Sequence, residues 1–493
     1  MLLCGIDLGT SSIKVSIVNA SNQKLVHSVS YPDKENEIIS PEIGWAEQDP
    51  NHWWYCIKEG IIRANSSGKY NPKDILSIGI SYQMHGLVLV DKNNEVLRNS
   101  IIWCDSRASK YGEKMTSDLG EEFCLSHLLN SPGNFTAAKL AWVKENQPEL
   151  FERIKYVLLP GDFISYKFTG EYTTSSSALS EGILWDFKNN SISNELLDQA
   201  GFSKNIFPPI YPVFSNHGNL SKSIAEELGL TTKVVIGYKA GDQPNNALSL
   251  GVLNPGEIAT TAGTSGVVYG VAEELKYDNQ HRVNSFAHVN HSNKQTRIGV
   301  LMCINGTGIM NRWVKDTFFP SNSYPELNKL ASQSPVGSKG IQAYPFGNGA
   351  ERIFLNKTIG AHLMNLDLNR HKNCDIIRAS QEGIAFSLVY GIELMRNAGI
   401  IPKEMRAGLA NMYLSEVFTE TIVNASGIPV KLMNADGAFG AALGSGVAIS
   451  IFNSPEQATE SIEINKIVEP QKDNLSVTKD AYNEWKEEMK KII

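Results

Sequence analysis

The amino-acid sequence predicts an α/β protein with two large domains. The chain has 493 residues, of which 42% are hydrophobic and 20% charged, as is typical of a globular protein with more than one domain. Strand-like apolar runs alternate with stretches of helical periodicity along the chain. A strand–turn–strand pattern near the start recurs in the second half. We therefore expect domains over 1–245 and 246–493, joined at a tight hinge near residues 239–247.

Charge and cysteine usage narrow the expected partners. The formal net charge is −7 without any run of Lys or Arg, so we expect no nucleic-acid partner and no anionic membrane partner. No apolar stretch approaches the roughly 20 residues that span a bilayer. The six cysteines are scattered without a C-x-x-C pair, which favours reduced thiols and a cytoplasmic location.

The first third of the chain predicts a β-meander followed by helices. Alternating apolar residues indicate strands at 3–7, 13–18 and 24–30, with turns at 9–12 and 19–22. Helical spacing follows at 48–64 and at 136–146, where Thr136 is a plausible N-cap. Between these helices, "ILSIGISYQMHGLVLVD" predicts a strand, a short loop and a second strand.

The second half repeats the opening pattern. In "GEIATTAGTSGVVYGVAEEL", the turn Gly263-Thr264-Ser265 matches Gly9-Thr10-Ser11, with apolar strands on both sides. Such similarity can reveal a duplication, although two unrelated hairpins that use common turn residues explain it equally well. Later helices are expected in "INGTGIMNRWVKDTF", in "SQEGIAFSLVYGIELMRNAG" and in "DGAFGAALGSGVAI", whose Gly and Ala residues suit close packing against backbone or ligand.

The two Gly-Thr-Ser turns are candidate phosphate sites. The sequence has neither G-x-x-x-x-G-K-[ST] nor a G-x-G-x-x-G that follows a strand and opens a helix. Backbone N–H groups and hydroxyls at a tight turn can bind phosphate oxygens, and Lys14 could add positive charge. Asp7, just before the first turn, is either a Mg²⁺ ligand or an acid that stabilises the bend.

A second acid, Asp242, follows an apolar strand in "VVIGYKAGDQPNNALSLG". With Pro244 two residues later, Asp242 fits the cap of a helix. Exposed at a strand end, it also fits a general base that takes a proton from a substrate hydroxyl during phosphoryl transfer. The local sequence leaves both interpretations open.

Two loops suit the binding of a polyol. "SYQMHG" carries Gln83, Met84 and His85, and "IIWCDSRA" carries Trp103 and Asp105. Polar groups beside an aromatic surface can pair with hydroxyls and stack on the C–H face of a sugar. A lone His is, however, often a satisfied structural residue, and Trp is often part of the core.

Taken together and in order, these motifs resemble the FGGY family of carbohydrate kinases. The similarity runs over nearly the whole chain, through "GIDLGTSSIK", "QMHGLVLVD", "IIWCDSR", "FTAAKLAWVKENQPELF", "LPGDFISYKFTGE", "AGDQ", "GEIATTAGTSGVVYGV" and "DGAFGAALGSGVA". Each motif alone is weak, whereas the ordered set is specific.

The resemblance implies two duplicated α/β domains of the actin-like (ribonuclease H-like) fold, with ATP and sugar meeting in the catalytic cleft between them. Domain 1–245 would carry the sugar site and domain 246–493 the ATP site. Asp242 is then the expected catalytic base and Asp7 the acid that serves Mg²⁺. The residues expected to bind the sugar are Gln83, Met84, His85, Asp105, Asp242 and Gln243, and those expected to bind ATP are Thr10, Ser11, Lys14, Gly263, Thr264, Gly408 and Asn411.

The Gln-Met-His-Gly loop points to the members of the family that act on xylulose. The resemblance therefore implies ATP-dependent phosphorylation of a ketopentose, D-xylulose at its C5 hydroxyl, with ATP and Mg²⁺ as cofactors. The small-molecule partners are the sugar and ATP, and a homodimer is left open.

The sequence departs from the family pattern at the sugar and adenine contacts. This chain has Ser81-Tyr82-Gln83 at a position where Ser-Gly-Gln is common in the family. The residue after the expected base is Gln243. Members that act on xylulose commonly have Asn at that position, and glycerol kinases have Gln. The segment expected beside the adenine, which is Gly-rich in the family, is Ala-Gly-Leu-Ala-Asn at residues 407–411 of this chain. The alternatives are a family kinase for L-ribulose, glycerol, L-fuculose or gluconate, or a non-catalytic actin-like nucleotide-binding protein.

Overall fold

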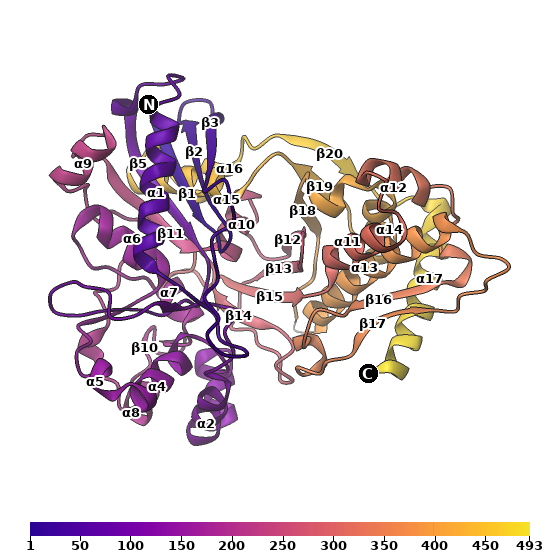
Figure 1. The fold of residues 1–493 in the computed structure, drawn as a ribbon, viewed down its shortest axis with the longest axis horizontal. Helices are drawn as coiled ribbons and strands as arrows, with labels where there is room; N and C mark the ends of the chain where they lie inside the picture. The colour runs from indigo at the N-terminus through magenta and orange to yellow at the C-terminus, as the bar shows by residue number, and fades with distance from the viewer. Residues whose placement is uncertain (398) are drawn as a thin grey trace.

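The computed structural model describes residues 1–397 and 399–493 and contains two large β-sheets with helices packed around them (Figure 1). The five-stranded first sheet has the order β11 (Val235–Gly241), β5 (Ile75–Tyr82), β1 (Leu2–Leu8), β2 (Ile13–Asn19), β3 (Lys24–Tyr31). The seven-stranded second sheet has the order β14 (Asn284–Ala287), β15 (Ile298–Ile304), β13 (Gly266–Ala272), β12 (Glu257–Ala262), β18 (Glu404–Gly408), β19 (Val430–Met433), β20 (Ile464–Val468).

Both sheets share one core topology. In the first sheet, β3, β2 and β1 form an antiparallel meander, and β5 and β11 continue in parallel from β1. In the second sheet, β15, β13 and β12 form the meander, and β18 and β19 continue in parallel from β12. The same order and directions confirm the duplication and exclude two unrelated hairpins. Strands β14 and β20 are added at the two edges of the second sheet.

The helices nearest to the first sheet largely follow the sequence pattern. Helix α1 (Pro50–Asn65) begins later than expected because Asp49 caps it, accepting a hydrogen bond from Asn51 N. Helix α4 (Thr136–Asn146) has the predicted bounds, but the prediction that Thr136 is its N-cap is wrong. Phe135 occupies the cap position, and the Thr136 hydroxyl donates instead to the His85 backbone oxygen at 3.2 Å.

The remaining helices surround the two sheets. Those in the first half are α2 (Ser109–Leu119), α3 (Glu121–Phe123), α5 (Pro148–Phe151), α6 (Pro160–Thr169), α7 (Ser176–Glu181), α8 (Asn194–Ala200) and α9 (Lys222–Leu228). Those in the second half are α11 (Thr307–Phe318), α12 (Tyr324–Ala331), α13 (Asn373–Asn397), α14 (Glu416–Ser426), α15 (Gly437–Ala448), α16 (Pro455–Thr459) and α17 (Lys472–Ile492), while α10 (Asp242–Ser249) spans the expected boundary between residues 245 and 246. Short two-stranded pairs are formed by β4 (Glu47–Gln48) with β7 (Ser100–Ile101), β6 (Val88–Val90) with β8 (Tyr156–Leu158), β9 (Trp185–Asp186) with β10 (Ser191–Ile192), and β16 (Gln342–Phe346) with β17 (Gly360–Met364).

Helix α15 comes from the second half of the chain but packs on the first sheet. A Cβ atom at Gly5 of β1 would lie 1.7 Å from the Ala438 backbone oxygen, and one at Gly79 of β5 would lie 1.8 Å from the Ala441 backbone oxygen. The Gly- and Ala-rich sequence of α15 therefore serves direct contact between helix and strand backbones, as expected. The domain boundary between residues 245 and 246 stays a proposal, and α15 packs across it.

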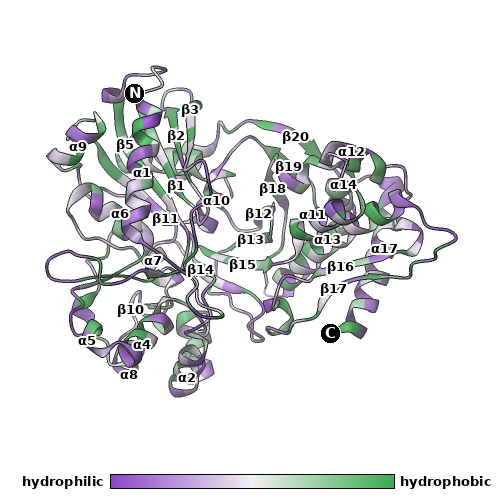
Figure 2. Ribbon diagram, viewed as in Figure 1, coloured by the Kyte–Doolittle hydropathy of each residue, from purple (hydrophilic) through white to green (hydrophobic). Residues whose placement is uncertain are grey.

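Hydrophobic residues concentrate in the strands, and the outer faces of the surrounding helices are more polar (Figure 2). A search of the described part of the chain for a helix both long and apolar enough to cross a bilayer found none.

Candidate active site

The candidate catalytic residues meet at one edge of the first sheet. The register pairs Leu8 with Tyr82 and Tyr82 with Gly241, so the carboxyl ends of β1, β5 and β11 lie side by side. Asp7 is one residue before the end of β1, and Asp242 directly follows β11. Ligands bind outside this edge in many sheets of parallel strands.

Asp242 has the environment of a general base. It is the first residue of α10, whose cap position is held by Gly241 without a side-chain capping bond, so the capping interpretation does not describe its role. Burial raises the pKa of Asp242 to about 7, the nearby carboxylate of Asp7 contributes in the same direction, and hydrogen bonds from Gln243 act against this. A carboxyl group with a pKa close to the working pH suits proton transfer.

Asp7 lies opposite the first turn of α15. Ser81 Oγ donates to Asp7 Oδ1 at 2.7 Å, and a Cβ atom at Gly437 would lie 2.5 Å from Asp7 Oδ2. The pKa of Asp7 is raised, first by burial, while the Ser81 bond opposes the shift and Asp436 adds to it. The missing side chain at Gly437 therefore lets the start of α15 approach the Asp7 carboxylate closely, and the raised pKa indicates a site where a cation would be favourable.

Lys14 and Asp436 connect the first hairpin to α15. Lys14 Nζ and Asp436 Oδ2 form an ion pair at 3.1 Å, and Asp436 caps α15 by accepting from Phe439 N at 2.9 Å. Lys14 thus lies at the N-terminus of this helix, a position that favours anions.

Whether Asp7 suits a Mg²⁺ ion depends on the acidic groups around it, and the binding of Mg²⁺ stays a prediction. Within residues 1–397 and 399–493, no group of three or more His, Cys, Asp or Glu side chains could hold a metal alone. Mg²⁺ at phosphoryl-transfer sites usually takes only one or two carboxylates, with phosphate oxygens and water completing its shell. Asp7, with Asp242 and Asp436 in electrostatic range, is compatible with that donor set.

The first Gly-Thr-Ser turn is connected to the expected sugar loops. Gly9 N donates to the Ser12 backbone oxygen at 3.1 Å, which closes the turn. Thr10 Oγ1 accepts from Trp103 Nε1 at 2.9 Å and donates to Gln83 Oε1 at 3.3 Å. Ser11 is exposed at the tip, where its hydroxyl is available to a ligand.

The second turn opens onto a cavity of about 610 Å³, a volume in the range of small-molecule sites. Three predicted residues, Gly263, Thr264 and Asn411, line it, and Gly408 ends the strand that leads to Asn411. Sequence reasoning missed its other lining residues, which come mainly from α11, α12 and the segment after β18: Ala262, Gly308, Ile309, Asn311, Arg312, Tyr324, Pro325, Asn328, Met412, Leu414 and Ser415.

The Gln83–His85 loop directly follows β5. Gln83 Nε2 donates to Gln48 Oε1 at 2.9 Å, and Met84 is buried against Gly241. His85 has a φ of 64°, and its Nδ1 lies 2.9 Å from the Glu181 backbone oxygen. Burial lowers the pKa of His85 to about 3, so the neutral ring donates from Nδ1 and keeps Nε2 as a hydrogen-bond acceptor.

Lys139 of α4 connects the two loops that were expected to bind the sugar, and it was missed in the sequence. Its ammonium donates to the His85 backbone oxygen at 2.9 Å and to the Ile102 backbone oxygen at 3.0 Å. Burial lowers the pKa of Lys139 to about 7. Two carbonyl acceptors fix both loops relative to α4, which explains how His85 keeps its left-handed backbone conformation.

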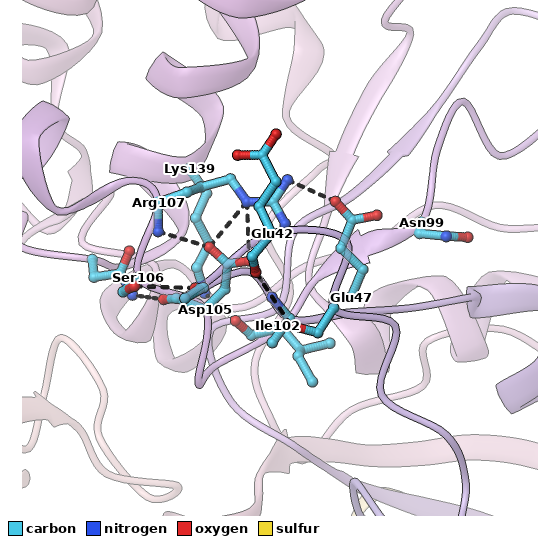
Figure 3. A network of polar contacts seen from close by, with 12 residues as sticks. Glu42, Glu47, Asn99, Ile102, Asp105, Ser106, Arg107 and Lys139 are labelled. Carbon is cyan, nitrogen blue, oxygen red and sulfur yellow. Dashed lines mark hydrogen bonds and ion pairs between the residues drawn. The ribbon is translucent and has the colours of Figure 1, made fainter. Parts of the chain in front are cut away.

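Asp105 lies in a buried ion-pair network (Figure 3). Arg107 Nη2 is 2.7 Å from Asp105 Oδ2, and Arg107 Nη1 is 2.6 Å from Glu47 Oε1. The same Asp105 Oδ2 accepts from Ala46 N at 2.6 Å. With both oxygens engaged by Arg107, this carboxylate is suited to holding the "WCDSR" loop, and its direct contact with a sugar stays a prediction.

Comparison with known proteins adds a decisive observation. Residues 2–249 match the model of the N-terminal domain of the FGGY family of carbohydrate kinases. The xylulose kinase of Bacillus subtilis is 34% identical over 402 residues, which is 80% of this chain and 77% of the relative. This chain belongs to the FGGY family of carbohydrate kinases. A second FGGY relative, the xylulose kinase of Staphylococcus epidermidis, is 30% identical over 490 residues, 98% of this chain and 95% of the relative.

Family membership fixes the class of reaction and the fold. An FGGY kinase is a phosphotransferase with an alcohol group as acceptor, and ATP and a small-molecule sugar are its substrates. The crystal structure of a xyloylose kinase from Brucella ovis is 25% identical and superposes with a TM-score of 0.89 over 99% of this chain and 98% of that one. The two duplicated domains described above are those of the actin-like, ribonuclease H-like fold.

Proposed function

We propose that this FGGY kinase transfers the γ-phosphoryl group of ATP to the C5 hydroxyl of D-xylulose. The observation that carries the proposal is the position of Asp242, which lies at the carboxyl end of β11 with its pKa raised to about 7 beside Asp7. The xylulose kinase relatives, which this chain resembles over most of its length, support the choice of sugar.

The side chains of the first half orient the sugar. Asp242 accepts the proton of the attacking hydroxyl, while Gln83, Met84 and His85 contact the rest of the molecule. Gln243 follows the base directly, and its buried Oε1 has no protein partner in the described structure, so it is available to a sugar hydroxyl. Orientation of this kind can lower the activation free energy by on the order of 7–11 kcal/mol.

The two hairpins bind the phosphates from opposite domains. Thr10, Ser11 and Lys14 act from the first hairpin, and Gly263 and Thr264 act from the second, beside the cavity that takes the adenosine. Asp7 would hold Mg²⁺, which supplies neutralisation of the charge on the phosphate oxygens. Closure of the domains excludes water, which otherwise competes with the sugar as acceptor.

Assays of ADP release test the sugar and the reaction together. The panel comprises D-xylulose, L-ribulose, glycerol, L-fuculose and gluconate, and we expect the highest kcat/KM with D-xylulose. Glycerol is the second candidate because Gln243 follows the base, and a preference for glycerol would overturn the choice of xylulose. Tight ATP binding without ADP release on any acceptor would indicate a non-catalytic nucleotide-binding protein.

Two further expectations from the sequence stay predictions. Light scattering of the purified protein tests the homodimer, and fractionation of the producing cells tests the cytoplasmic location.

A further inference from the structure

Glu181 is a buried carboxyl group beside the proposed base, and the roles assigned above do not use its side chain. It ends α7 and is 1% exposed. Its backbone oxygen pairs with His85, which places residue 181 between the sugar loop and β11. Glu181 Oε2 lies only 2.3 Å from where a Cβ atom at Gly241 would be, so the carboxyl group packs on the residue that precedes Asp242.

The Glu181 carboxyl group has few partners. Among the described residues, no group forms a hydrogen bond with Oε1. The Tyr82 side chain lies close enough to the carboxyl group to lower its pKa. Lys139 is a basic side chain in electrostatic range, but its ammonium already donates to two backbone oxygens.

The groups that face Glu181 disfavour its ionised form. The pKa of Glu181 is raised well above its usual value, first by burial and then by Asp242, with Asp162 acting in the same direction and Tyr82 against it. The hydroxyl of Tyr269 also lies within electrostatic range. A buried carboxylate without an ion-pair partner normally takes up a proton.

Tyr82 fits this environment specifically. Its ring fills the space above Gly161, where a Cβ atom would lie 2.1 Å from Tyr82 Cδ1. In the sheet Tyr82 pairs with Gly241, the residue that precedes the base and on which the Glu181 carboxyl group packs. Tyr82 is one of the departures from the family pattern, in which glycine is common at this position. A glycine there would place no hydroxyl beside Glu181.

We propose that Glu181 is a positioning residue for phosphoryl transfer, whose carboxyl group lies beside Tyr82, packs under Gly241 and fixes the location of the Asp242 carboxylate. The inference rests on the proposed function, because it takes Asp242 as the base. As a neutral acid, Glu181 supports the backbone of Gly241 without repelling the ionised base, whereas a second carboxylate would repel it.

Steady-state kinetics with D-xylulose as a function of pH test this role, using Glu181→Ala, Glu181→Gln and a control. In Glu181→Ala we expect kcat to fall by about tenfold or more while KM for ATP changes little, because the base loses its support. Glu181→Gln should keep most of the wild-type kcat. The ascending limb of its plot of kcat/KM against pH should stay at the wild-type pH, because the amide is also uncharged. The control Ser177→Ala removes a buried hydrogen bond to the Ala287 backbone oxygen from the same helix, and it should lower Tm without lowering kcat.

Two results would overturn the proposal. Wild-type kcat in Glu181→Ala would show that Glu181 does not position the base. An ascending limb displaced to lower pH in Glu181→Gln would show that wild-type Glu181 is ionised. If Glu181→Ala does not fold, Tyr82→Phe replaces it in the assay. We expect this variant to have a lower kcat and an unchanged KM for ATP. A wild-type kcat in Tyr82→Phe would count against the proposal. Turnover retained in Asp242→Asn, or a wild type inert with every sugar, would contradict the proposed function instead.

Discussion

At the scale of single residues, the electrostatics of the site centre on Asp242 and Asp7. The two carboxyl groups lie close enough for one to raise the pKa of the other. A cation bound near Asp7 would relieve the repulsion between the two carboxylates and would favour the ionised form of the base.

The Asp242→Asn variant separates chemistry from binding. The amide keeps the shape of the side chain but cannot accept the hydroxyl proton, so we expect kcat to fall by at least about two orders of magnitude, the usual contribution of a general base. ATP affinity, measured by calorimetry, should stay nearly unchanged. Near-normal turnover in this variant would show that Asp242 is not the base.

The pH dependence of kcat/KM reports the same group. Because the base acts in its ionised form and its pKa is raised to about 7, activity should rise with pH through that region and fall below it. His85, with a pKa of about 3, stays neutral over this range and therefore does not change the plot of kcat/KM against pH. A profile that is flat down to pH 5 would contradict this prediction.

At the scale of secondary-structure elements, small residues decide how the helices meet the sheets. α15 contacts β1 and β5 through backbone atoms at Gly5 and Gly79, and α10 contacts α15 where a Cβ atom at Gly440 would lie 1.9 Å from Ser249 Oγ. The helix that presents Gly437 to Asp7 is therefore positioned by direct contact between backbones.

Gly79→Ala should disturb this contact. The added methyl group would overlap the Ala441 backbone oxygen, so we expect destabilisation of about 1–3 kcal/mol or more, measured by chemical denaturation. Gly270→Ala in β13 is the matched control, because its methyl group would meet nothing closer than 3.3 Å, the flexible end of Met395. Equal effects of the two substitutions would argue against tight packing at α15.

The sequence predicted the elements better than their contacts. Alternating apolar residues around turns gave β1, β2, β12 and β13 because such patterns depend on neighbouring residues alone. The hydrogen bond of the Thr136 hydroxyl and the burial of Asp105 depend on partners remote in sequence, His85 and Ala46, which no local pattern reveals. The cavity residues were missed for the same reason, since polar positions on α11 and α12 look like ordinary solvent-facing sites.

At the scale of the whole molecule, the active site requires both halves of the chain. Asp7 and Asp242 come from the first half, whereas the cavity and the second phosphate turn come from the second. The halves are also joined at β14, where Asn130 Nδ2 donates to the Ser285 backbone oxygen at 2.5 Å.

A chain truncated after residue 250 should not form a stable domain. It would lack α15, so the face of the first sheet around Gly5 and Gly79 would be uncovered. We expect no cooperative thermal transition for this fragment alone, and recovery of kinase activity when residues 251–493 are supplied in trans. Cooperative unfolding of the isolated fragment would show that α15 is dispensable for its fold.

The position of α15 also determines the order of events during biosynthesis. Domains usually fold as the ribosome releases them, the first one first. Here the strands of the first sheet are complete at Gly241, but the helix that covers them emerges only after every strand of the second sheet except β20. An apolar face of the first sheet therefore stays exposed on the nascent chain until α15 has been synthesised. This makes the chain a candidate client for chaperones that bind during translation.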